Sequence, residues 1–402
     1  YNPGFQLSFA ATWGILYLGP LFNEAITGLL KGLPAPAGLT RSASLGLAVP
    51  LAAQLATVPL VAWYYNMITP VAILANLLTT PLVGLVLFLG ILAALLGQIW
   101  LTLAWLINAG TGVVLELFLA LVGFLQRLPG AVYYLATPPV ILAAAWYAGL
   151  LAAGQILAGG SDPALRQRLK GRAAPGAALA AALLLIWWPW AGAQRLTVHF
   201  LDVGQGDCIL VQTPGGKNML IDAGGRKDEF LTGSGAGDQV VVPYLRRLGV
   251  RRLDVLVLTH PHEDHAGGAA AVVNSVPVAL AVVSPVSGLP GEEPAGRLAA
   301  VAGSEAKAVE IPPAYTILLQ QLAEDGVPVR AASAGDALKL DQGLRIEFLS
   351  PGGGAPAGLN DSSLVMKLTY GRRAFLFTGD VELESQRGLL ARGAGLDVDV
   401  LK

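Results

Sequence analysis

The sequence has little charge and almost none of the cysteine chemistry that small secreted and zinc-finger proteins use. Only 13% of its 402 residues are charged and 54% are hydrophobic, whereas about a quarter of the residues of an average soluble protein are charged. Cys208 is the only cysteine, which excludes an intrachain disulfide and a zinc site built from several cysteines. We predict that it is a small buried residue in a strand. The formal net charge of −1 gives no support for a simple nucleic-acid-binding protein.

The few charged residues are unevenly distributed along the chain. Seven of the 26 lysines and arginines, and three of the 27 acids, precede Arg195. The sequence therefore predicts an almost uncharged domain, residues 1–193, followed by a normally charged domain, residues 194–402. The chain begins at Tyr1 without methionine, so we expect a piece of a longer protein with no signal peptide to interpret.

The first half contains six apolar runs that approach the roughly 20 residues needed to cross a bilayer as a helix. Links rich in proline and glycine, such as Leu128–Gly130, separate several of them. Six such runs with so little charge between them disfavour a set of buried helices in a soluble protein. The predicted spans run from about Phe5 to Phe22, Ser42 to Tyr65, Val71 to Gly97, Ile99 to Leu125, Val140 to Leu157 and Ala177 to Trp190.

Lysine and arginine predict the orientation of these spans, because basic loops tend to stay in the cytoplasm. The link between the fifth and sixth runs carries four basic residues between Arg166 and Arg172. With strict alternation, Lys31 and Arg41 lie on the same cytoplasmic side. The sixth run would then deliver everything after Arg195 to the outer face.

Glu116 is the only ionisable residue near the middle of a predicted span. A charge at membrane depth usually faces the interior of a helix bundle or a watery path, which favours a channel-lining role for Glu116. A protonated or hydrogen-bonded glutamate that ties two helices together is an equal alternative.

Beyond Arg195 the pattern changes to short strands and amphipathic helices. They occur in two successive sets, which favours a two-sheet sandwich with helices outside. Strands are predicted at 196–203, 208–212, 218–221, 253–258, 344–348, 364–368, 374–377 and 398–401, and helices at 243–248, 267–273, 314–324 and 382–390.

Three of the four histidines lie within six residues, directly after a predicted buried strand. Imidazole is the commonest metal-binding side chain near neutral pH, and a tight turn after a strand can direct several such side chains at one point. His260 and His262 could share one metal, and Asp264 and His265 could serve a second. A surface histidine cluster is the weaker alternative.

Two other features have simpler interpretations. His199 stands alone in an alternating run, and we predict an ordinary strand residue. The run Gly204-Gln205-Gly206 invites a dinucleotide-binding interpretation, but Ile209 stands where the third glycine of that fingerprint belongs. We predict a tight loop instead.

The run His260-x-His262-x-Asp264-His265 resembles the signature of the metallo-β-lactamase superfamily, and Leu220–Gly224 and Phe377–Asp380 resemble its companion motifs. This resemblance implies an αββα sandwich with a two-metal centre. It also implies that Asp380 bridges the metals and that Asp222 supports the ligand loops without binding a metal itself. The implied metal ligands are His260, His262, Asp264, His265 and Asp380.

Within that superfamily, His199–Asp207 is similar to the ComEC family of competence proteins, the DNA-internalisation channels of naturally transformable bacteria. Asn2–Phe9 resembles that family's competence domain, and Asn360–Val365 resembles its later hydrolase motif. The resemblance spans essentially the whole chain and implies a polytopic α-helical membrane domain followed by the αββα domain. The residues expected to support the ligands without touching a metal are Asp202, Asp207, Asp222, Asn360 and Ser363.

Two departures from the family pattern bear on the metal centre. Many superfamily members have a third histidine near Asn360–Ser363, where this chain has none, and ComEC-like chains continue past Lys402 into a His-His-Gly-Ser stretch. We therefore expect the chain ending at Lys402 to bind metal weakly, since losing even a supporting residue typically costs about 10–100-fold in affinity. Up to two ions are expected, and zinc and manganese stay open, because histidine suits zinc and carboxylates suit manganese.

The implied chemistry is an in-line attack on a phosphodiester by a metal-activated water, with Asp264 orienting the nucleophile. Four arginines form the densest basic cluster of this half and could hold a phosphate backbone. A solvated helix end is at least as good an interpretation of them. The four residues are Arg246, Arg247, Arg251 and Arg252.

The leading hypothesis is a DNA-uptake channel in the bacterial cell (inner) membrane. Its extracytoplasmic domain would degrade one strand of duplex DNA while the other crosses as a single strand, and its further partners would be membrane lipids and other competence proteins. A membrane-tethered metallo-hydrolase of small molecules is one alternative, which the six spans disfavour. A channel whose hydrolase-like domain binds DNA without cleaving it is a second alternative, which the intact histidine motif disfavours.

Overall fold

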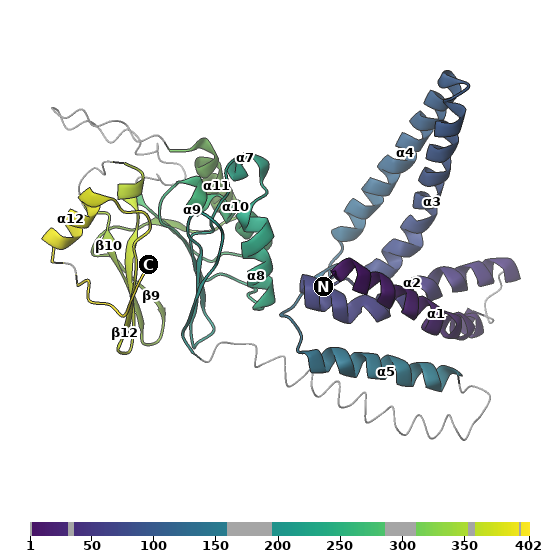
Figure 1. Cartoon of the computed structure of the whole chain (residues 1–402), viewed down its shortest axis with the longest axis horizontal. Helices are drawn as coiled ribbons and strands as arrows, with labels where there is room; N and C mark the ends of the chain where they lie inside the picture. The colour runs from purple at the N-terminus through teal and green to yellow at the C-terminus, as the bar shows by residue number, and fades with distance from the viewer. Residues whose placement is uncertain (1, 31–35, 159–194, 286–310, 353–357, 394) are drawn as a thin grey trace. The chain divides into compact units, whose positions relative to one another are not determined.

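The computed structural model describes residues 2–30, 36–158, 195–285, 311–352, 358–393 and 395–402. The chain divides into two compact units, residues 1–188 and 189–402, which are the helical part and the two-sheet part of Figure 1. The predicted boundary at 193–194, the sixth apolar run and the basic residues from Arg166 to Arg172 fall outside the described residues.

Long apolar helices make up the described part of the first unit, and they account for five of the six predicted runs. Four of them are long and apolar enough to cross a membrane, and the fifth contains the shorter apolar stretch Val140–Gln155. The most apolar window of the fourth helix has no buried residue, as expected of a helix that is apolar on all sides and meets lipid. The helices are α1 (Pro3–Leu30), α2 (Ala37–Tyr65), α3 (Ala72–Leu96), α4 (Leu101–Gln126) and α5 (Val140–Ala158).

Small residues hold α1, α2 and α5 together. Ala48, Ala52 and Ala56 recur every four residues along α2 and are fully buried, and a Cβ atom on Gly14 of α1 would collide with Ala56. Small residues at this spacing let helix backbones approach closely in a membrane. Trp146 of α5 donates a hydrogen bond from Nε1 to the carbonyl oxygen of Leu55, at 2.8 Å.

Two short strands join the links on either side of the α3–α4 hairpin. Strand β1 (Met67–Ile68) pairs antiparallel with β2 (Tyr133–Tyr134), and Asn66 Nδ2 donates a hydrogen bond to Thr137 Oγ1 at 2.8 Å. The chain therefore leaves through α3 and returns through α4 to the same end of the helices. Strict alternation of spans requires this arrangement.

Glu116 lies in the middle of α4 and its side chain is exposed on the surface of the chain. Among the described residues, no hydrogen bond or ion pair connects it to another helix. The structure thus gives no support to the helix-tying interpretation within one chain. A channel-lining role for Glu116 stays a prediction.

The second unit is an αββα sandwich, as predicted (Figure 1). One sheet has the order β3-β4-β5-β6-β7-β8 and the other β13-β12-β11-β10-β9. Pairing in the first sheet is antiparallel from β3 to β5 and parallel from β5 to β8. The strands are β3 (Thr197–Phe200), β4 (Ile209–Gln212), β5 (Asn218–Ile221), β6 (Val255–Leu258), β7 (Ala281–Val283), β8 (Val329–Ala331), β9 (Ala337–Asp341), β10 (Leu344–Ser350), β11 (Val365–Tyr370), β12 (Arg373–Phe377) and β13 (Val400–Leu401).

Alternate residues of β6 face two different cores, which explains its uninterrupted apolar run. Val255 and Val257 belong to the core between the sheets, whereas Leu256 and Leu258 belong to the core under the helices of the first sheet. A smaller core around Leu389 attaches a helix to the second sheet. The helices are α7 (Glu229–Thr232), α8 (Val242–Arg247), α9 (Glu263–Ala266), α10 (Ala269–Ser275), α11 (Pro313–Glu324) and α12 (Leu383–Ala391).

The sequence pattern missed β7, β8 and β9. The first two are three residues long, which is too short to show a period, and β9 lies at a sheet edge with no fully buried residue. The single cysteine, Cys208, is buried immediately before β4. His199 lies in β3 between Tyr244 Oη (3.0 Å) and Gln212 Oε1 (3.2 Å), so it is the ordinary strand residue that was expected.

Candidate metal centre

The histidine motif folds into the turn between β6 and α9. His260 follows the strand, His262 is the N-cap residue of α9, and His265 lies within that helix. The ring centroids of His260 and His265 are 4.3 Å apart, and His260 Nε2 lies 3.1 Å from His262 Nδ1. His260 and His265 are fully buried. A four-residue strand and a tight turn therefore bring the imidazoles together.

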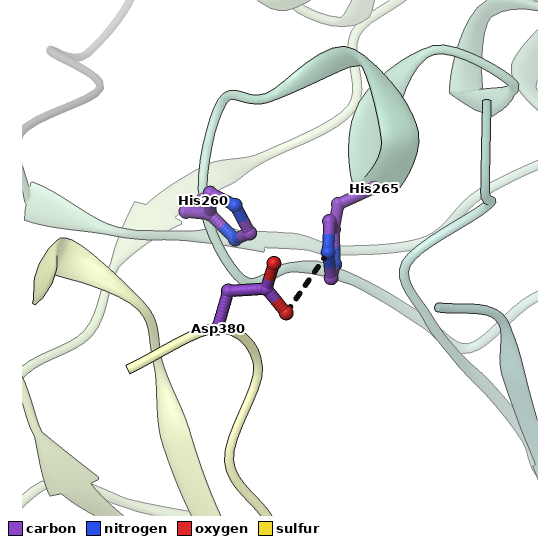
Figure 2. Close-up of side chains that lie close together, drawn as sticks. All are labelled: His260, His265 and Asp380. Carbon is purple, nitrogen blue, oxygen red and sulfur yellow. Dashed lines mark ion pairs between the residues drawn. The ribbon is translucent and has the colours of Figure 1, made fainter. Parts of the chain in front are cut away.

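Asp380 reaches the same point from the second sheet, where it follows β12. Its Oδ1 atom lies 3.2 Å from His265 Nε2 (Figure 2). Gly379 has a φ of 53°, a backbone conformation that favours glycine. The amide of Asp380 donates a hydrogen bond to Ser363 Oγ at 3.3 Å. Gly379 and Ser363 thus position the carboxylate of Asp380.

Asp222 holds the His265 ring from the opposite side. It is fully buried after β5, and its Oδ2 lies 2.8 Å from His265 Nδ1. The same carboxylate accepts hydrogen bonds from the Thr259 amide at 2.7 Å and from the Thr259 hydroxyl at 2.6 Å. These contacts engage Nδ1 of His265 and leave Nε2 facing Asp380.

The electrostatics of the cluster separate the two buried imidazoles. Burial works against a charge on His265, but its contacts with Asp222 and Asp380 outweigh burial and raise the pKa of His265 to about 10. Burial, with the charges of His265 and His262, lowers the pKa of His260 to about 3. The contact with His265 holds the pKa of Asp380 below its usual value. The cluster thus favours one neutral imidazole beside a positive charge flanked by carboxylates.

The residues present fit a divalent metal ion. His260, His265 and Asp380 each offer a donor atom, and these atoms lie within 4.8 Å of one another. His265 Nε2 is buried and, among the described residues, has only the 3.2 Å contact with Asp380, without a well-aligned hydrogen bond, so a cation that displaced its proton would gain a nitrogen donor there. Two imidazole nitrogens and a carboxylate oxygen are donors that zinc and manganese both accept.

A second group of donors consists of Asp207, Asp222 and His265, which are all buried and also lie within 4.8 Å. It shares His265 with the first group. The ammonium of Lys402 forms an ion pair with Asp207, so that carboxylate already has a positive partner.

Asp264 does not join either donor group. It lines a neighbouring pocket with Asp202 and Glu263. Successive residues of a helix point about 100° apart, so the helical turn that aims His265 at Asp380 directs Asp264 elsewhere. His262 adjoins His260 but also lies outside both groups. The ligand roles of Asp264 and His262 therefore stay predictions.

The residues expected to support the ligands fall into two sets. Asp207, Asp222 and Ser363 contact the donor groups directly, as described above. Asp202 is exposed and its Oδ1 accepts a hydrogen bond from the Gly204 amide at 3.2 Å, which stabilises the tight loop predicted at Gly204–Gly206. Asn360 Nδ2 donates a hydrogen bond to Glu382 Oε1 at 2.9 Å. This bond connects the Asn360 segment to Glu382, the residue before α12.

The four arginines proposed to bind phosphate lie at the other end of β6. Arg246 and Arg247 end α8, and Arg251 and Arg252 precede β6. The histidines follow the C-terminal end of β6, whereas the arginines lie near its N-terminal end. The four residues of the strand, at about 3.3 Å each, separate the two groups. The topology therefore gives no support to a contact between these arginines and a substrate at the cluster.

Under the nuclease hypothesis, the double variant Arg251→Gln/Arg252→Gln is expected to cleave DNA within about twofold of the parent chain at moderate salt, because screening weakens charges beyond about 10 Å. Initial cleavage rates measured side by side would check this. A loss of tenfold or more would show that a substrate reaches this end of the sheet.

Two family models match the chain: Competence protein over residues 1–159 and Metallo-beta-lactamase superfamily over residues 201–400. The chain thus carries a Competence protein domain followed by a metallo-beta-lactamase domain. The chain is 25% identical to ComE operon protein 3 of Bacillus subtilis (strain 168), with a match that covers 100% of this chain and 47% of the relative. It is 29% identical to Competence protein ComA of Neisseria gonorrhoeae, over 48% of this chain and 21% of the relative.

The chain thus spans about half the length of the Bacillus relative. Among solved structures, Zn(2+)-bound PqqB from Methylobacterium extorquens is similar at 16% identity and a TM-score of 0.29, over 48% of this chain and 58% of that chain.

Two residues that sequence reasoning missed hold the site together. Glu263 stands between the ligand candidates, and its carboxylate accepts hydrogen bonds from the amides of Phe230 (2.8 Å) and Asp228 (3.1 Å). The position of Glu263 inside the histidine motif could have indicated this supporting role. Lys402 forms an ion pair with Asp207, which lies 195 residues away in the sequence. A local sequence pattern cannot predict such a contact.

Proposed function

We propose that this competence protein is part of a DNA-uptake channel whose metallo-β-lactamase-type domain hydrolyses one strand of incoming DNA while the other crosses the membrane. The observation that carries the proposal is the His260–His265–Asp380 cluster, in which the buried Nε2 of His265 faces Asp380, in a chain whose other half matches the competence proteins. DNA would then be the main partner, together with membrane lipids and other competence proteins.

In this proposal His260, His265 and Asp380 hold a divalent ion, zinc or manganese, with room for up to two ions in the domain. When bound, the metal supplies Lewis acidity and lowers the pKa of a water towards 7. Asp222 keeps the His265 ring oriented through Nδ1, and Ser363 keeps Asp380 in reach. Asp264 lines the adjoining pocket, and its role in orienting the attacking water stays a prediction.

The test is a cleavage assay on the purified chain in detergent, with end-labelled single-stranded and duplex DNA and either Zn²⁺ or Mn²⁺ titrated until the signal no longer changes, so that a weak metal site is filled. Cleavage that a chelator abolishes supports the proposal. Hydrolysis of a lactam or thioester, with DNA left uncut under both metals, would identify a small-molecule hydrolase instead. DNA binding without cleavage under either metal would identify a domain that only grips DNA.

We further propose that the residues after Arg195 face away from the cytoplasm. The proposal rests on the basic residues between Arg166 and Arg172 and on the rule that such loops stay inside. The pairing of β1 with β2 supports the alternation on which the argument depends. Reporter fusions after Ala193 and within 166–172 should report opposite sides. A fusion after Trp100, between α3 and α4, is a control expected on the cytoplasmic side, and a cytoplasmic signal from the Ala193 fusion would refute the orientation.

A further inference from the structure

A pocket of about 700 Å³ adjoins α9, the helix that carries His265. Its walls come from three segments: residues 202–205 before β4, residues 225–227 after β5, and Glu263 with Asp264 at the start of α9. Sites for small ligands commonly have volumes of about 300–1,000 Å³. The pocket is therefore large enough for a nucleotide, and one of its walls begins beside the metal-binding cluster.

The walls of this pocket are preformed. A Cβ atom on Gly206 would overlap the carbonyl oxygen of Asp264, and one on Gly225 would overlap the carbonyl oxygen of Glu263. Both loops thus pack directly against the backbone of α9. The Glu263 carboxylate also fixes the segment after Lys227 through its hydrogen bonds to the amides of Asp228 and Phe230. A preformed pocket loses little entropy on binding.

The rim of the pocket offers positive charge that is available to a ligand. Lys227 is exposed and has no hydrogen bond or ion pair among the described residues. Arg226 is exposed, and its guanidinium donates one hydrogen bond, from Nη1 to Gln239 Oε1 at 2.9 Å. This bond holds the guanidinium and leaves its other donors without a hydrogen bond among the described residues. Two such cations side by side suit a phosphate group.

Three acids also line the pocket, but two of them are already engaged. Both oxygens of Glu263 accept peptide hydrogen bonds, and Asp202 accepts one from Gly204. The third acid, Asp264, lies nearest to the cluster in sequence. Gln205 is exposed at the rim without a hydrogen bond among the described residues, and an amide can pair with the edge of a base.

We propose that this pocket binds the nucleotide next to the phosphodiester bond that the metal centre hydrolyses. Lys227 and Arg226 hold its phosphate, and Gln205 contacts its base. This inference rests on the proposed nuclease function, because it names how that site would hold its polymer. The pocket suits an unpaired nucleotide better than a duplex, because its rigid walls enclose one side of the ligand.

The test is equilibrium binding of a fluorescein-labelled thymidine decamer to the purified full chain in detergent, followed by anisotropy at several salt concentrations in EDTA. EDTA removes cleavage from the measurement. Lys227→Gln and Arg226→Gln should each weaken binding about fivefold or more and reduce the slope of log K against log salt by about 0.7, the value expected per phosphate contact of a single strand. Gln205→Ala should weaken binding and leave the slope unchanged.

Arg372→Gln is the matched control. Arg372 is an exposed arginine in the turn before β12, at the opposite end of that strand from Asp380, and its loss should leave binding unchanged. Unchanged affinity and slope in the Lys227 and Arg226 variants would overturn the proposal, as would an equal loss in the control. If the pocket variants lose binding but the parent chain cleaves no DNA with any metal, the pocket stands and the nuclease proposal fails.

Discussion

His260→Ala and Asp380→Ala are each expected to lower kcat/KM for metal-dependent DNA cleavage by at least about 100-fold. Each variant removes one of the three donors that lie within 4.8 Å of one another. Losing a residue that only supports a ligand already costs about 10–100-fold in metal affinity or activity, so losing a donor should cost more. Cleavage of end-labelled DNA, together with the metal content of the purified chain, measures both consequences.

His199→Asn provides a histidine control for these variants. His199 lies in β3 against Tyr244 and Gln212 and belongs to neither donor group, so its loss should leave metal content unchanged. Normal metal content and cleavage in Asp380→Ala would show that the metal is held by other residues and that the cluster is wrongly assigned.

Asp222→Ala should damage both the stability of the second unit and its metal binding. The buried carboxylate accepts two hydrogen bonds from Thr259 and contacts His265 Nδ1 at 2.8 Å. Removing one partner of a buried charged pair typically costs about 3–5 kcal/mol, and removing a partner that orients a ligating histidine typically costs about 10–100-fold in metal affinity. Hydrogen exchange of the β5 and β6 amides and metal titration measure the two effects separately.

Asp222→Asn is the milder companion variant, because an amide keeps an oxygen that can accept from Thr259 but removes the negative charge beside His265. We expect most of the stability to return while metal affinity stays reduced. Asp325→Ala, at an exposed acid that ends α11, serves as the control and should leave metal affinity unchanged. Metal affinity equal to that of the parent chain in both Asp222 variants would show that His265 does not bind metal through this arrangement.

Much of the fold could be predicted because it follows from local pattern. An almost uncharged half with 20-residue apolar runs has few soluble alternatives, and five of those runs are helices α1–α5. The run Val255–Leu258 is apolar throughout because it is buried on both faces, and the histidines follow it directly. Strands of three residues, such as β7, are too short to show an alternating pattern, so the sequence did not predict them.

The sequence by itself determined the division into two domains, the sandwich architecture and the closeness of His260 to His265, because these depend on composition, period and short-range spacing. Tertiary structure alone decided the rest. It brought Asp380 and Lys402 from the second sheet onto His265 and Asp207, and it put the arginines at the far end of β6. Periodicity reports which face of an element is buried, whereas contacts between sheets depend on how distant segments close and pack, which no local pattern encodes.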